Sequence, residues 1–170
     1  LLYPDGTLQH GGVILGVGPH DGPRVAGHLH PSAAREDTGY YGHLRVARNC
    51  SGVTAACMAL RKSVFDEVGG LNAADLPVAF NDVDLCLKIR EAGYQIIWTP
   101  HAELYHMESA SRGADVKPEA VARAQREIAY MRGRWAEVLD NDPYFGPNFD
   151  PRFGDYRLAS PPRRVKPWRL

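Results

Sequence analysis

The stretch FNDVDLCLKIREAGY, residues 80–94, decides the fold of this chain. It opens with acidic and amide side chains, which favour a helix start because they complement the unpaired N–H groups there. Asn81 or Asp82 is therefore expected to cap the first turn. Gly93 is a typical residue just beyond a helix end. The stretch predicts one helix with a signal at each end.

The two aspartates of this helix are predicted to differ. At about 100° per residue, Asp84 shares a polar stripe with Lys88, at the i,i+4 spacing of a favourable ion pair. Asp82 lies on the side of Cys86 and Ile89, which the pattern assigns to the interior. Asp84 is therefore expected to be a solvated pair partner. Asp82 is expected to be either a helix cap or a functional carboxylate.

Composition limits the class of protein. The chain has 170 residues, 44% hydrophobic and 24% charged, which suits one soluble globular domain. Lysine plus arginine equals aspartate plus glutamate, at 20 each, so no net charge indicates nucleic acid as a partner. Three cysteines without a CxxC pair favour reduced thiols over a structural zinc site. The chain begins in apolar sequence without a methionine, so we expect a piece of something longer.

Short extended and helical segments alternate around the central helix. Residues 53–60 are apolar on both faces, which is typical of a central strand. Residues 63–68 read as a short helix that ends at a Gly-Gly pair, and residues 95–99 as a strand that Pro100 stops. This order predicts an α/β sheet with short connections.

The flanking segments are less regular. Residues 16–48 are rich in Gly, Pro and His without a sustained period, which predicts a long surface loop. We interpret its His28 and His30 as loop histidines rather than a metal pair. Pro118 opens a long helix with an apolar stripe, typical of core packing. Residues 151–170 are expected to form an extended or disordered tail.

Nine short motifs are spread over most of the chain. They are LYPDGT (2–7), VTAAC (53–57), FDEVGGL (65–71), NDVDLCL (81–87), AGY (92–94), WTP (98–100), LYH (104–106), ESASRG (108–113) and DPYFGPN (142–148). In order and spacing they resemble the C-terminal half of family 2 glycosyltransferases, especially bacterial rhamnosyltransferase-like proteins that build cell-surface polysaccharide. The resemblance implies a partial GT-A (Rossmann-like) fold over residues 1–150, the acceptor-side half of that domain. This fold is a mixed sheet flanked by helices, plus the C-terminal amphipathic helix.

The resemblance implies an inverting transfer of a sugar from a nucleotide-sugar donor to a saccharide or lipid-linked acceptor. Asp82 takes the position of the general base that deprotonates the acceptor hydroxyl. The family has a glutamate where this chain has Asn81, so the base is kept and the glutamate is not. Asn81, Asp84 and Trp98 are expected on the acceptor side.

The resemblance also implies a divalent cation, Mn²⁺ or Mg²⁺, which neutralises the leaving diphosphate. His106 takes the position of one metal ligand, and the rest of the site is expected from a nucleotide-binding half that this sequence lacks. The polar segment 108–113 is expected to form a lid over the donor diphosphate. Its expected contacts come from Glu108, Ser109, Ser111 and Arg112.

Two other interpretations stay open. The chain could be a non-catalytic module that binds saccharide or a protein partner, with Asp82 serving only as a helix cap. It could also be a metal-dependent hydrolase that uses Asp82, His106 and Glu108. In the glycosyltransferase interpretation the isolated piece is expected to be inactive. Its expected place is the cytoplasm or, by peripheral association, the inner face of the cell membrane, and an exposed sheet edge favours a homodimer.

Overall fold

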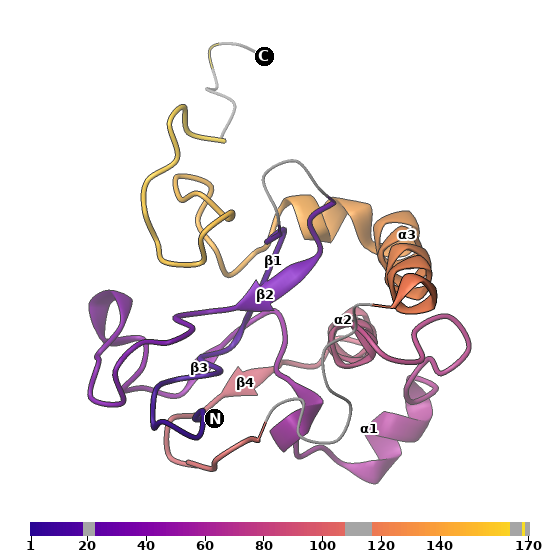
Figure 1. Ribbon diagram of the computed structural model, residues 1–170, viewed down its shortest axis with the longest axis horizontal. Coiled ribbons are helices and arrows are strands. Elements are labelled where there is room, and N and C mark those ends of the chain that lie inside the picture. Colours follow the sequence, from indigo (N-terminus) through magenta and orange to yellow (C-terminus); the bar gives the residue numbers. More distant parts are fainter. Residues whose placement is uncertain (19–22, 108–116, 164–167, 169–170) are drawn as a thin grey trace.

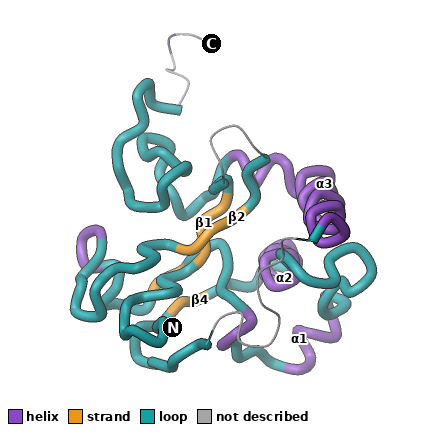
Figure 2. Tube along the Cα trace, viewed as in Figure 1, coloured by secondary structure: helices purple, strands orange, loops and turns teal. Residues whose placement is uncertain are grey.

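The computed structural model describes residues 1–18, 23–107, 117–163 and 168. These residues form a small α/β unit in which short strands run beside three α-helices (Figures 1 and 2). The strands are β1 (Val13–Leu15), β2 (Ala26–His28), β3 (Arg48–Asn49) and β4 (Ile97–Trp98). The α-helices are α1 (Lys62–Glu67), α2 (Asn81–Glu91) and α3 (Pro118–Asp140), and two single 3-10 turns are η1 (Tyr40–Gly42) and η2 (Ala55–Cys57).

The strands form two antiparallel pairs. β1 pairs with β2, with Val13 opposite His28, and β3 pairs with β4, with Arg48 opposite Trp98. A single antiparallel bridge from Val13 to Gly52 links the two pairs. The α/β class is confirmed, and the regular strand pairs of the described residues are all antiparallel.

Helix α2 ends as predicted, and Asp82 contributes to its start. Phe80 precedes the helix in a left-handed conformation (φ 60°) without a side-chain cap, and the Asp82 carboxylate accepts from the N–H of Val83 in the first turn at 2.8 Å. The predicted contribution of Asp82 to this helix end is therefore confirmed. At the other end, Gly93 is left-handed (φ 89°) and its N–H donates to the carbonyl oxygen of Arg90 at 2.9 Å. The N–H of Tyr94 reaches back to Ile89 at 3.1 Å, which completes a Schellman motif.

Helices α2 and α3 pack against each other and against β1. Their shared core holds Leu76, Val83, Leu87, Met131 and Leu139, each at most 5% exposed. Both helices lie on one side of the strands in Figure 1. The predicted amphipathic helix from Pro118 is therefore confirmed, and its stripe buries side chains at i,i+4 steps.

Residues 53–60 do not form the predicted central strand. The Thr54 hydroxyl accepts from the N–H of Ala56 at 3.4 Å and turns the chain into η2, whose residues are exposed. The residues just before this segment make the sheet contacts instead, because β3 pairs with β4 and Gly52 forms a bridge with Val13. The prediction failed because small apolar residues suit a tight turn as well as a packed strand, and periodicity cannot separate the two.

Two elements that the composition did not indicate lie wholly within the predicted long loop, residues 16–48. They are β2 and η1, and Tyr40 of η1 stacks on Tyr156 with ring centroids 4.4 Å apart. Tyr156 is buried and shares an aromatic cluster with Phe145 and Phe149. In the described part of the chain, no helix is both long and apolar enough to cross a membrane.

Candidate functional site

Asp82 stands at the start of α2 and holds a neighbouring loop. One carboxylate oxygen accepts from the backbone N–H of Ala55 at 3.0 Å, and the other accepts from the N–H of Val83 at 2.8 Å. The side chain is partly exposed rather than interior. Each oxygen has a second lone pair, so the carboxylate can also accept a proton or a hydroxyl group from solvent.

Asp84, predicted to be solvated, is fully buried (0% exposed). Its ion pair with Lys88 is confirmed at 3.2 Å. The other carboxylate oxygen accepts from the indole N–H of Trp135 at 2.8 Å. The helical period placed Asp84 on a polar stripe, but α3 covers that stripe and supplies the indole partner. Asp84 therefore lies in the helix interface, and Asp82 is the accessible carboxylate.

His106 lies beside the N-terminal segment. Its backbone N–H donates to Leu2 O at 2.9 Å, and its Nδ1 lies 2.9 Å from Oε1 of Gln9. In the tautomer that has its proton on Nδ1, this N–H donates to the amide oxygen of Gln9, and the lone pair of Nε2 is free. This is the tautomer in which Nε2 can bind a metal ion, with Gln9 orienting the ring.

His10 connects the surroundings of His106 and Asp82. Its Nε2 accepts from the N–H of Thr54 at 3.4 Å, and Thr54 adjoins the Ala55 amide that Asp82 binds. Burial, followed by the charge of His28, lowers the pKa of His10 to about 2. Neutral His10 therefore donates from Nδ1 to Nδ1 of His28 at 2.7 Å. Gln9 and His10 are neighbours in the chain, as are Thr54 and Ala55, so three hydrogen bonds and these two backbone links together form a polar network from His106 to Asp82.

Sequence reasoning missed Gln9, His10 and Thr54. Nothing in their local pattern distinguishes them, because their partners lie far along the chain. His28 and His30, interpreted above as loop histidines rather than a metal pair, contact different partners. His28 contacts His10, whereas the ring of His30 stacks on Tyr156 at 5.5 Å.

A cavity of about 380 Å³ adjoins this network. His10, Cys57 and Trp98 line it, together with Leu1, Val53, Met58, Ala59, Ile97, Thr99 and Ala102. The indole N–H of Trp98 donates to the carbonyl oxygen of His10 at 3.3 Å, so the ring is fixed in place. Trp98 is thus an aromatic residue in a fixed orientation at the cavity. Asn81, the other residue expected on the acceptor side, is partly exposed at the first position of α2.

The described residues do not form a metal site by themselves. Within them, no group of three or more His, Cys, Asp or Glu side chains is arranged to hold a cation. His106 supplies at most one ligand, and a hard divalent cation needs several oxygen ligands as well. The four predicted lid residues, Glu108, Ser109, Ser111 and Arg112, lie outside the described residues.

Comparisons with known proteins show relatives that match most of this chain. No model of a protein family matches the chain, and no solved structure matches it significantly. The chain is 50% identical, over 95% of its length, to the uncharacterized protein y4gI of Sinorhizobium fredii. It is 33% identical, over 92% of its length, to the O-antigen biosynthesis protein RfbC of Myxococcus xanthus.

A third relative is matched over a shorter stretch. The chain is 27% identical over 82 residues, 48% of its length, to an N-acetylglucosaminyl-diphospho-decaprenol L-rhamnosyltransferase of Mycobacterium tuberculosis, of which the match covers 26%. The chain spans only 17% of the y4gI protein and 11% of RfbC. The similarity is therefore to one part of each of these proteins.

Proposed function

We propose that this chain is part of an inverting glycosyltransferase, with Asp82 as the general base. One observation carries the proposal: the accessible carboxylate at the start of α2 is held by the Ala55 and Val83 amides and keeps lone pairs for a substrate. The similarity to an O-antigen biosynthesis protein over 92% of the chain, and to a rhamnosyltransferase over 48%, supports sugar transfer as the reaction class.

The proposed step balances as a single displacement. The acceptor hydroxyl gives its proton to the Asp82 carboxylate while its oxygen forms a bond to the anomeric carbon of the donor sugar. The bond from that carbon to the diphosphate oxygen breaks, and the nucleoside diphosphate leaves with the electron pair. A carboxylate placed by two backbone N–H groups is already oriented for this proton transfer.

The donor is proposed to be a nucleotide sugar, and the acceptor a saccharide or a lipid-linked saccharide. The cavity beside Trp98 and His10 is the proposed acceptor side, because an aromatic wall suits the apolar face of a sugar ring. We also propose that Nε2 of His106 is one ligand of a divalent cation whose remaining ligands lie outside the described residues. Such a cation would neutralise charge on the leaving diphosphate.

The test is a transfer assay on the longer protein that contains this chain, with a panel of nucleotide sugars and Mn²⁺. Asp82→Asn keeps an oxygen that can accept from Ala55, so the fold should be retained while turnover falls by at least about a hundredfold. Asp66→Asn is the matched control, since Asp66 is an exposed helix carboxylate that pairs with Lys62. Wild-type turnover in Asp82→Asn would remove Asp82 from the mechanism.

A further inference from the structure

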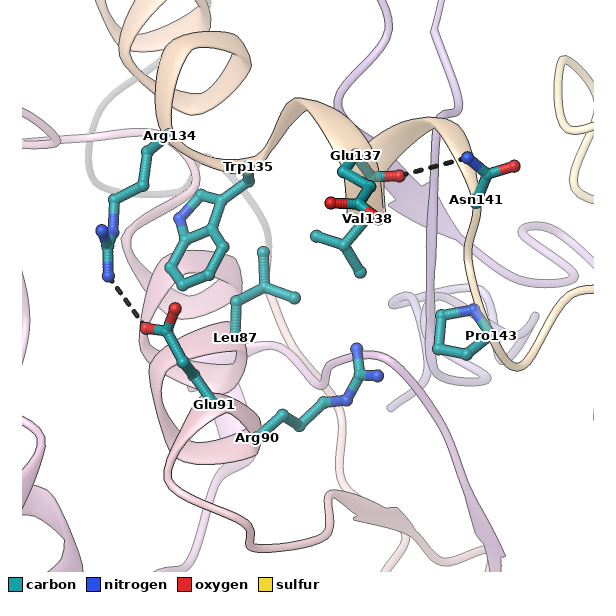
Figure 3. Close-up of a pocket in the computed structure, with 9 residues that line it drawn as sticks. All are labelled: Leu87, Arg90, Glu91, Arg134, Trp135, Glu137, Val138, Asn141 and Pro143. Atoms are coloured by element: carbon teal, nitrogen blue, oxygen red, sulfur yellow. Dashed lines mark hydrogen bonds and ion pairs between the residues drawn. The ribbon is translucent and has the colours of Figure 1, made fainter.

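A second cavity lies at the opposite end of α2 from Asp82. It has a volume of about 500 Å³, within the range of small-molecule sites. Figure 3 shows its walls, which come from the last turns of α2, from the second half of α3 and from the turn that follows α3. Leu87, Val138 and Pro143 supply an apolar surface, and Arg90 points between them.

Arg90 is the unusual group of this cavity. Its Nη1 atom is buried, and among the described residues it has no hydrogen-bond partner. The guanidinium carbon lies over the ring of Tyr144, 5.1 Å from its centroid. This cation–π contact stabilises the charge but gives the N–H groups no oxygen acceptor. A buried charged donor without an acceptor is costly, so an arrangement that keeps one indicates an absent partner.

The neighbouring charged and polar groups are already engaged. Arg134 pairs with Glu91 at 3.0 Å, the contact drawn in Figure 3, and its guanidinium covers the Trp135 ring at 4.3 Å. The Trp135 indole N–H is used by Asp84. Arg90 therefore remains as the charge that can receive an anion inside the cavity.

The rim has a different chemistry. Glu137 and Asn141 line it, and both are exposed. The Asn141 amide donates to the main-chain oxygen of Glu137 at 3.4 Å, the second contact drawn in Figure 3, so both residues place polar groups at the cavity. Carboxylate and amide oxygens accept from hydroxyl groups but repel an anion. A ligand is thus oriented with its anionic end at Arg90 and its hydroxyl groups at the rim.

We propose that this cavity binds a hydroxylated organic oxyanion, a sugar phosphate or a sugar carboxylic acid, with Arg90 as the residue that binds its charge. The planar guanidinium suits both oxyanions, because both accept paired N–H bonds. The kink of α3 at Trp135 (φ −119°, ψ 15°) places wall residues from both sides of the bend around the ligand. The site is independent of the function proposed for Asp82.

A purely structural role for Arg90 makes a different prediction. A cation near the end of α2 is favoured by the helix dipole, and its stacking on Tyr144 adds to this. If these contacts were its whole purpose, Arg90→Gln would lower the melting temperature and no anionic sugar would bind. In the proposed site, Arg90→Gln leaves the melting temperature unchanged or raises it, because a buried N–H donor without an acceptor is removed from a side chain that is otherwise partly exposed.

The test measures binding by calorimetry with glucose 1-phosphate and glucuronate, compared with neutral glucose and inorganic phosphate. We expect at least one anionic sugar to bind, and to bind at least about tenfold more tightly than glucose or inorganic phosphate. The indole N–H resonance of Trp135 should shift on binding. Arg90→Gln should weaken binding at least about tenfold. Arg126→Gln, a substitution of an exposed arginine in α3, should not.

Val138→Phe gives a second measurement if Arg90→Gln does not fold. It fills the apolar wall, retains every charge and should abolish binding. Binding of the phosphate or of the carboxylate sugar identifies the oxyanion. Binding of neither, equal binding of glucose or of inorganic phosphate, or unchanged affinity in both variants would overturn the proposal.

Discussion

The indole N–H of Trp135 donates to the buried carboxylate of Asp84 at 2.8 Å. Lys88 lies 3.2 Å from the other oxygen of that carboxylate and donates to the main-chain oxygen of Gly70 at 2.6 Å. One buried charge therefore joins α2 to α3 and to the turn after α1. The contact also fixes Trp135 at the kink of α3, where the wall of the 500 Å³ cavity begins.

We expect Trp135→Phe to lower the free energy of unfolding by about 1.5–3 kcal/mol, the value of a hydrogen bond to a charged group. Phenylalanine keeps an aromatic body but leaves Asp84 with Lys88 alone. Urea unfolding measures the change. Trp168→Phe is the matched control because Trp168 is 75% exposed, and it should stay within about 0.5 kcal/mol of wild type. Equal stability of the two variants would show that the indole contact contributes nothing.

The parts of the fold that could be predicted from sequence are those with local causes. The end of α2 follows from Gly93, since only a residue that tolerates positive φ completes the Schellman turn. The start of α3 follows from Pro118, whose missing N–H costs nothing in the first turn. Each signal lies within a few residues of its effect.

The rest depends on contacts that no local pattern contains. Asp84 was assigned to solvent because its partner, Trp135, lies in another helix. Asp82 accepts from Val83 in its own helix, as expected, but its second contact is with Ala55 in a separate loop. For the candidate site, sequence therefore indicated Asp82 and His106 but not the network of Gln9 and His10 between them.

His10 should make stability depend on pH. Its pKa is about 2 in the folded chain and about 6.5 when unfolded, so below pH 6.5 the unfolded chain binds a proton that the folded chain does not. Stability is therefore full above pH 6.5 and falls as pH decreases, with a slope of up to about 1.4 kcal/mol per pH unit from this group. Unfolding at pH 7.5, 6.5, 5.5 and 5.0 measures the slope before most carboxylates titrate.

The variant His10→Gln isolates this contribution, since the glutamine oxygen can still accept from the N–H of Thr54. Burial also lowers the pKa of His30 and His43, so the wild-type slope includes their share and the difference between variants is the informative quantity. We expect a flatter profile for His10→Gln and a wild-type profile for His101→Gln, an exposed residue. Parallel profiles for all three proteins would contradict the buried neutral state of His10.

The same substitution should act in opposite directions at two glycines. Gly93 has φ 89°, so Gly93→Ala should cost about 1–2 kcal/mol although nothing lies within 4 Å of the added methyl group. Gly133 lies inside α3, and its added methyl group also meets nothing within 4 Å. Gly133→Ala should therefore stabilise by about 0.5–1 kcal/mol through helix propensity. Denaturant unfolding compares the two, and a shared sign would refute the backbone argument.

The three cysteines should differ in reactivity by burial. Cys50 and Cys86 are buried, and burial raises the pKa of both thiols, that of Cys86 to about 12. Cys57 lies exposed in η2. Because the thiolate is the reactive form, a disulfide reagent should modify one thiol rapidly in the native protein and all three in denaturant. Cys57→Ser should remove the rapid phase. A rapid phase that persists in this variant would show that the core around Cys50 or Cys86 opens far more readily than its packing implies.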